Sequence, residues 1–308
     1  MTNPTYDFTR GSAAEATNPL HLIRIDHLQL TGSIEKLEPL YRRLGFDRVA
    51  SQQAPWGRQI HLRQERMDIL IFEANEEHRA GQYFKKHGEG AWALNFQVTS
   101  LDHALKEALK RGARLAVPPE THDLESGRIH FAAIQGVGDV LNYFIEREGS
   151  CEPFWPGLSL DALPALCHPG LVRIDHLTNN VGPGEMEQLV KFYGDIFGFV
   201  VTSTFNIRGQ LGTGLNSKVV QSSDNRIMIP INEPTDDKSQ VQEYVNRHKG
   251  QGIQHIAMST NDIFETLRTL RSQGFRFLEI PQTYYDLLPD RIAKGGYQVS
   301  ESLTTAEE

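Results

Sequence analysis

Two histidines, His176 and His255, each lie inside a short apolar run typical of a strand, RIDHL (173–177) and IQHIAMST (253–260). A single histidine in such a run is more often an ordinary structural residue. Two of them on neighbouring strands, joined by one carboxylate, would form the two-histidine, one-carboxylate set that leaves open positions on Fe(II) for a chelating substrate and for dioxygen. Because rigid strands hold ligands better than loops do, the pattern predicts a mononuclear iron site.

The string Arg-Ile-Asp-His-Leu occurs twice, at 24–28 and at 173–177, which indicates a duplicated module. A helical pattern follows each copy and is closed by a glycine, Gly45 in the first and Gly198 in the second. Each copy then continues with further strands and a second helix that also ends at a glycine. The elements that position the histidines are therefore expected twice, in two α+β units rich in antiparallel strands.

The first copy carries His27, Asn95 and Glu146 at the places that we align with a ligand set. In this alignment Asn95 corresponds to His255, and Glu146, on the last strand of a hairpin, marks the position of the carboxylate. Asparagine is a poor iron ligand beside imidazole. The first copy is therefore predicted to have lost its metal, with structural roles for His27 and Glu146.

The carboxylate of the second copy is expected at or beyond the end of the chain. The interval from Gly112 to Glu146, counted from Gly274, reaches the last residue, Glu308. The final string SESLTTAEE has no strand pattern, so Glu307 and Glu308 are poor candidates. The chain looks cut short, as a fragment or a natural truncation, and we expect it to bind Fe(II) weakly and to turn over little.

Charge and composition exclude several classes of partner. The net charge is −8 and the isoelectric point about 5.9, which argues against nucleic acid or an anionic membrane surface. No apolar run approaches the ~20 residues that span a bilayer. Cys151 and Cys167 are expected to be reduced, in a cytoplasmic protein without a secretory signal. His248, in NRHKGQG, is interpreted as a solvated helix end.

These patterns predict the domain organisation. We expect a flexible leader over 1–20, a first module over 21–148, a proline-rich linker over 149–170, and a second module with the iron site over 171–308, truncated at its end.

Several strings of the second copy occur together in one known family. They are VRIDHLTNNV (172–181), GLNSKVVQSSDNRIMIPINEP (214–234), KSQVQEYV (238–245), GIQHIAMSTNDIFETLRTLR (252–271) and PQTYYDLL (281–288). The chain resembles the 4-hydroxyphenylpyruvate dioxygenase family of the vicinal-oxygen-chelate superfamily. The resemblance implies an α+β fold of duplicated βαβββ modules of the glyoxalase/bleomycin-resistance/dioxygenase type, forming two open barrels. It also implies that the first module is degenerate and serves structure and oligomerisation.

The resemblance further implies a site and a reaction. Fe(II) would be bound by His176, His255 and one glutamate. The substrate 4-hydroxyphenylpyruvate would be held by polar side chains, namely Ser217, Asn232, Gln240 and Gln254. With O2 as co-substrate, the products would be homogentisate and CO2, in tyrosine and phenylalanine catabolism. A homo-oligomer, dimer or tetramer, is expected.

Two other functions stay open from the sequence. One is 4-hydroxymandelate synthase, which uses the same substrate and iron, although the string PINEP (230–234) favours the dioxygenase. The other is a non-catalytic small-molecule-binding protein of the same fold. Taken alone, Ser217 and Asn232 are ordinary turn or strand-end residues, and Gln240 is an ordinary surface residue of a helix.

Overall fold

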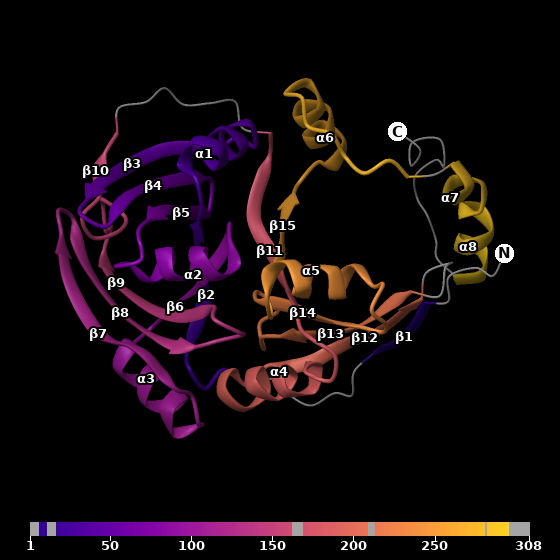
Figure 1. Ribbon diagram of the computed structural model, residues 1–308, viewed down its shortest axis with the longest axis horizontal. Helices are drawn as coiled ribbons and strands as arrows, with labels where there is room; N and C mark the ends of the chain where they lie inside the picture. The colour runs from indigo at the N-terminus through magenta and orange to yellow at the C-terminus, as the bar shows by residue number, and fades with distance from the viewer. Residues whose placement is uncertain (1–5, 11–16, 162–168, 209–212, 281, 296–308) are drawn as a thin grey trace.

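The structure is a computed structural model that describes residues 6–10, 17–161, 169–208, 213–280 and 282–295. Two curved sheets lie side by side in it, one of nine strands and one of six among the described residues (Figure 1). No helix in these ranges is long and apolar enough to cross a membrane. The predicted α+β architecture with a duplicated unit is confirmed.

The first sheet is built by the first module and has the strand order β10-β3-β4-β5-β2-β6-β9-β8-β7. Its elements in chain order are β2 (Leu22–Thr31), α1 (Ile34–Arg43), β3 (Asp47–Ala54), β4 (Gly57–Gln64), β5 (Met67–Ala74), α2 (Arg79–His87), β6 (Gly90–Val98), α3 (Leu101–Lys110), β7 (Leu115–Leu124), β8 (Gly127–Gln135), β9 (Leu141–Gly149) and β10 (Ser159–Leu160). The sheet curls strongly, so that its strands surround a filled interior (Figure 1).

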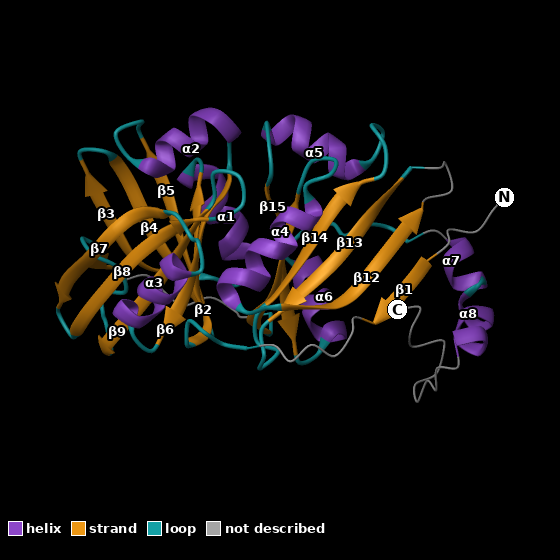
Figure 2. Cartoon of the chain, turned by 90° about the horizontal axis from the view of Figure 1, so that it is seen from below, coloured by secondary structure: helices purple, strands orange, loops and turns teal. Residues whose placement is uncertain are grey.

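The second sheet has the strand order β1-β12-β13-β14-β11-β15. Its elements are β1 (Tyr6–Arg10), β11 (Leu171–Asn180), α4 (Met186–Phe192), a π-helical turn η1 (Tyr193–Phe197), β12 (Val200–Arg208), β13 (Gly214–Gln221), β14 (Met228–Pro234), α5 (Gln240–His248), β15 (Gly252–Thr260), α6 (Ile263–Ser272), α7 (Gln282–Asp286) and α8 (Leu288–Gly295). This sheet is more open, and α4 covers its outer face (Figures 1 and 2).

The two modules match element by element. β2 pairs with β6 antiparallel and with β5 parallel, and β11 pairs in the same way with β15 and β14. Three irregularities interrupt the β2–β6 register, and three interrupt the β11–β15 register at corresponding positions. In both modules one of them directly precedes the histidine of the repeated string, His27 or His176. The repeat therefore preserves local backbone geometry as well as fold.

Glycines end the first helix of each module as predicted. Gly45 has φ 91° and Gly198 has φ 73°, a conformation that costs a residue with a side chain energy. Directly before Gly198, Phe197 is fully buried, and its ring lies 5.3 Å from that of Phe96 and 6.1 Å from that of Phe144. Burying such a side chain stabilises a fold by about 1.5–3 kcal/mol, so this cluster joins the modules into one core.

Parts of the predicted leader and linker are built into the modules. Tyr6–Arg10 form β1, which pairs with β12, and Leu20 is fully buried, so a flexible leader over 1–20 is wrong for these residues. In the linker, Phe154 and Trp155 are buried in the first module. The Pro-rich composition gave no sign of this, because two aromatic anchors suffice to fix a segment otherwise typical of a loop.

Candidate metal centre in the second module

The structure brings His176 and His255 together on neighbouring strands. His176 lies on β11 and His255 on β15, with ring centroids 5.8 Å apart and planes at 75°. Cross-strand neighbours this close on one face of a sheet can direct two ring nitrogens at one ion. Their role as metal ligands remains a prediction, and the geometry is compatible with it.

Each imidazole has one nitrogen engaged with a side-chain oxygen. His176 Nδ1 donates to Asp175 Oδ2 at 2.9 Å, and His255 Nδ1 donates to Gln254 Oε1. The other nitrogen of His255, Nε2, accepts from the hydroxyl of Thr178 at 2.9 Å. Among the described residues no hydrogen-bond partner lies on His176 Nε2. Both rings are thus in the form in which Nε2 carries the lone pair that a metal needs.

Burial, together with the neighbouring His176, lowers the pKa of His255 below its ordinary value. A lowered pKa keeps the imidazole neutral at pH 7, and a neutral imidazole is the form that binds a metal. The electrostatic setting of this histidine therefore suits a ligand.

The predicted substrate residues lie on the same sheet. Ser217 on β13 is directly opposite Asn232 on β14, so their side chains point to one face. That face is the inner one, because the adjacent residues Lys218 and Glu233 reach outward to α4, where Lys218 pairs with Glu187 and Glu233 accepts from the Met186 amide at 3.1 Å.

The remaining two predicted residues lie at the rim of this inner face. Gln240 is the first residue of α5 and is exposed, while Gln254 on β15 contacts His255. Since α5 contacts both β14 and β11, Gln240 lies at one end of the concave side of the sheet. Two of the four side chains thus line the inner face and two lie at its border.

The third ligand lies outside what the structure describes. No group of three histidine, cysteine, aspartate or glutamate side chains that could hold a metal is found among the described residues. Glu307 and Glu308, the weak candidates from the sequence, fall outside them as well. The described donor set is therefore two neutral imidazoles.

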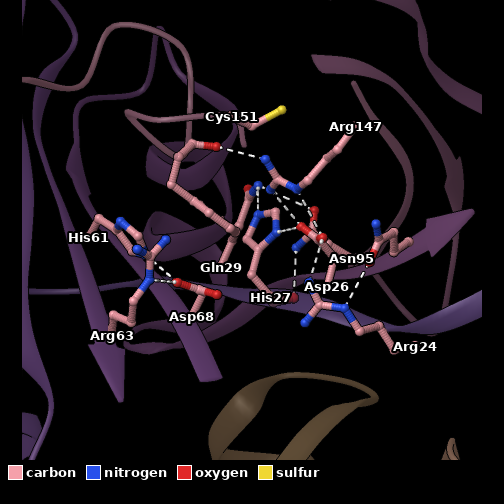
Figure 3. A network of polar contacts seen from close by, with 12 residues as sticks. Arg24, Asp26, His27, Gln29, His61, Arg63, Asp68, Asn95, Arg147 and Cys151 are labelled. Carbon is pink, nitrogen blue, oxygen red and sulfur yellow. Dashed lines mark hydrogen bonds and ion pairs between the residues drawn. The ribbon is translucent and has the colours of Figure 1, made fainter. Parts of the chain in front are cut away.

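The matching place in the first module holds a sealed polar network (Figure 3). His27, fully buried, donates from Nδ1 to Asp26 at 2.7 Å and accepts at Nε2 from the Gln29 amide at 3.0 Å. Arg147 pairs with both oxygens of Asp26, at 3.0 and 2.7 Å. The rings of Phe154 and Trp155 pack against His27 at 5.2 and 5.1 Å. Both nitrogens of His27 are therefore used, and the space beside it is filled.

The charges of this network follow from its geometry. Burial alone would raise the pKa of Asp26, but Arg147 and His27 overcome it and hold that pKa well below its usual range. Burial lowers the pKa of His27 although Asp26 opposes the shift. The network is thus an ionised carboxylate clamped by Arg147, beside a neutral imidazole.

A second buried group adjoins it. His61 donates from Nε2 to Asp68 at 2.7 Å, and Arg63 joins Asp68 to Glu152 of the linker, each contact at 2.8 Å. The ring of Phe154 stacks on His61 at 4.6 Å. The interior of the first module is therefore occupied by its own side chains.

Two alignments made from the sequence are wrong. His27 pairs with Asn95, whereas His176 pairs with Ala257. The residue that corresponds to His255 is Ala93, which lies opposite Gln29 as His255 lies opposite Thr178. The loop before the helix-ending glycine differs in length between the modules, so counting back from that glycine shifted the alignment by two positions.

Glu146 and His248 also depart from their predictions. Glu146 accepts from the Leu101 amide at 2.6 Å, so it faces α3 and not the interior where His27 lies. Its neighbour Arg147 points inward instead, since adjacent strand residues face opposite ways. His248, interpreted as solvated, is buried against the first module and accepts from the Tyr83 hydroxyl at 2.8 Å.

Comparison with protein families gives two matches that together cover most of the chain. Residues 17–155 match the family described as hydroxyphenylpyruvate dioxygenase, N-terminal. Residues 173–288 match the glyoxalase/bleomycin resistance protein/dioxygenase superfamily.

Relatives of known name agree. The chain is 35% identical over 278 residues to a 4-hydroxyphenylpyruvate dioxygenase of Legionella pneumophila (strain Corby), covering 89% of this chain and 76% of that protein. It is 32% identical over 292 residues to a 4-hydroxyphenylpyruvate dioxygenase of Pseudomonas aeruginosa, covering 92% and 78%. It is also 35% identical over 288 residues to a protein named Hemolysin VllY of Vibrio vulnificus, covering 90% and 78%.

A solved structure shows the same fold. A mutant of 4-hydroxymandelate synthase from Streptomyces coelicolor superposes with a TM-score of 0.76 at 22% identity, covering 88% of this chain and 80% of that one. The predicted vicinal-oxygen-chelate fold is confirmed.

Proposed function

Because this chain belongs to the 4-hydroxyphenylpyruvate dioxygenase family, we propose that it converts 4-hydroxyphenylpyruvate and O2 to homogentisate and CO2. The observation that supports this most is the pair His176 and His255, whose rings meet on the inner face of the second sheet. Ser217 and Asn232 lie on the same face, where they can bind a polar substrate. The reaction belongs to tyrosine and phenylalanine catabolism.

Fe(II) is the metal we propose for this pair. Imidazole nitrogens with a free lone pair fit it, and the side of His176 that carries Nε2 is partly open, with 27% of the side chain exposed. When bound, iron supplies the chelation of the 2-oxo acid and the activation of dioxygen. The described residues offer two neutral ligands and no carboxylate, so we expect weak binding and slow turnover from them.

The chain's own polar groups would position the substrate. Ser217 is buried, and Asn232 lies opposite it, so both can donate or accept hydrogen bonds away from bulk water. Gln240 and Gln254 would hold the substrate at the rim of the same face. A pocket built from such groups rejects analogues that lack the matching oxygen, because its buried groups are then left unpaired.

Oxygen consumption tests the proposal. The purified chain with an excess of Fe(II) and 4-hydroxyphenylpyruvate should consume O2 and form homogentisate, and His176→Ala should stop both. An Asp102→Ala variant, altered at an exposed carboxylate of α3, serves as the matched control and should keep the wild-type rate. Absence of O2 uptake in every variant at saturating iron would contradict the proposal, and 4-hydroxymandelate as product would assign the alternative reaction.

Assembly and location are further parts of the proposal. The resemblance supports a homodimer or homotetramer, which light scattering of the purified chain tests. A cytoplasmic location agrees with Cys151 being a free thiol. Fractionation of cells that express the chain would check it.

A further inference from the structure

Asp175 and Gln254 share an unusual relation to the two candidate ligands. Each directly precedes one of the histidines in the chain, and each directs a side-chain oxygen at Nδ1 of that histidine. In a regular strand, side chains of adjacent residues point to opposite faces and cannot meet in this way. A local departure from regular pairing must therefore bring each oxygen to its ring.

Bulges provide that departure at both places. Ile174 pairs with Met258 and His176 with Ala257, so Asp175 has no residue opposite it. In the same way Thr178 pairs with His255 and Asn179 with Ile253, which leaves Gln254 without a partner. An extra residue in a bulge turns its side chain away from the ordinary alternation.

The oxygens have a chemical consequence for the rings. A carboxylate or amide oxygen can only accept, so the nitrogen that faces it must carry the proton. With Nδ1 protonated, the lone pair of each ring is on Nε2. We propose that Asp175 and Gln254 are positioning residues that hold His176 and His255 in this tautomer, so that Nε2 of each is ready for a metal. This inference rests on the proposed function for its purpose, but not for its geometry.

The first module supports the inference independently. There Asp26 is the residue without a partner between Ile25 and His27, and it binds Nδ1 of His27 at 2.7 Å. The arrangement of bulge, carboxylate and ring is thus the same in both modules. What differs is Nε2, which the Gln29 amide occupies in the first module. The device is older than the difference in use, because both copies of the repeat have it.

Imidazole 15N chemical shifts of the metal-free protein test the tautomers directly. In protein labelled with 15N-histidine, and assigned with His176→Gln and His255→Gln, both rings should show a protonated Nδ1 and a bare Nε2. Asp175→Ala should convert His176 to a mixture of tautomers and leave His255 unchanged. Asp175→Asn, which keeps an acceptor oxygen, should restore the wild-type pattern. Gln254→Leu should act in the same way on His255 alone.

Two outcomes would overturn the inference. One is a wild-type ring with its proton on Nε2. The other is an Asp175→Ala protein, folded by circular dichroism, whose His176 keeps a fully protonated Nδ1. Asp102→Ala should leave both rings unchanged and serves as the control for the loss of a surface carboxylate.

Metal titration separates this inference from the proposed function. Loss of a group that orients a metal-binding histidine lowers metal affinity about 10–100-fold. Co(II) titration followed by its visible absorption should show that loss for Asp175→Ala and recovery for Asp175→Asn. If the wild-type chain binds no Co(II) or Fe(II) while the tautomers respond as described, the iron site is wrong and the positioning role stands. If metal binds but neither variant changes the tautomers or the affinity, the positioning role is wrong.

Discussion

The two modules have the same strands in the same order but opposite interiors. In the first, the histidine of the repeated string is fully buried and has both ring nitrogens satisfied by Asp26 and Gln29. In the second, the equivalent His176 has Nδ1 satisfied by Asp175, and its side chain is partly exposed. A buried polar group must be paired to be tolerated, whereas a metal ligand must keep one lone pair free. The comparison shows how one backbone supports either condition.

The outer edge of each sheet explains part of the contrast. In the first module, β6 pairs on its far side with β9, which brings Arg147 over Asp26. In the second, β15 is the last strand of the sheet among the described residues, and His255 on it is exposed. Extra strands thus close the first interior around a fixed ion pair, which the described part of the second lacks.

Removing the clamp of the first module should have the largest effect. Arg147→Leu leaves the Asp26 carboxylate buried without its cation, which typically costs about 3–5 kcal/mol. Arg173→Leu, at the exposed arginine of the second copy of the string, should cost less than about 1 kcal/mol. Urea unfolding of the two variants measures the difference, and equal losses would contradict the contrast between a sealed and an open interior.

Restoring the missing histidine of the first module should not restore a metal site. Ala93 is fully buried opposite Gln29, so Ala93→His overfills the interior and should cost about 1–3 kcal/mol. His27 Nε2 stays occupied by the Gln29 amide, so Co(II) should still bind at one site per chain. The His255→Ala variant should lose that site. A second Co(II) bound by the Ala93→His variant would show that the first module is not sealed.

The sequence predicted the elements better than their register. The duplicated string, the helix periodicity and the closing glycines identified two equivalent α+β units, because these signals depend on local backbone preferences. The alignment of Asn95 with His255 failed, since strand register is set by cross-strand pairing and by bulges, which leave no mark in spacing alone. Glu146 failed for the same reason, by one residue.

Acid should weaken the first module through its neutral buried imidazoles. Burial lowers the pKa of His61, although Asp68 opposes the shift. A folded-state pKa below the unfolded value of about 6.5 means that the unfolded chain binds the proton first as pH falls. The stabilisation is therefore complete above about pH 6.5 and is lost below it, by at most about 1.4 kcal/mol per pH unit for one group.

His61→Gln tests this. The amide keeps a donor for Asp68 but does not titrate, so the free energy of unfolding of the variant should fall less steeply than that of the wild type between pH 6.5 and 5. Parallel slopes would mean that His61 does not contribute to the acid sensitivity.

A second repeated pattern joins the modules and was missed in the sequence. Helices α2 and α5 lie next to one another (Figures 1 and 2), and each carries a tyrosine four residues before a histidine at its end: Tyr83 and His87, Tyr244 and His248. The two histidine rings stack across the interface at 4.3 Å. The hydrogen bonds break this symmetry, because Tyr83 donates to His248 across the interface while Tyr244 donates to the Ile253 carbonyl of its own module.

This asymmetry gives the smallest expected effect and a matched control. A double-mutant cycle of Tyr83→Phe with His248→Leu should give a coupling energy of about 1 kcal/mol, the usual worth of one hydrogen bond. The corresponding cycle of Tyr244→Phe with His87→Leu should give less than about 0.5 kcal/mol, since the structure shows no bond between that pair. Both follow from urea unfolding at pH 7.5, where burial has lowered the pKa of His248 and the ring accepts the Tyr83 proton. Equal coupling in the two cycles would mean that the modules meet symmetrically in solution, and the difference between them would then lie in their interiors alone.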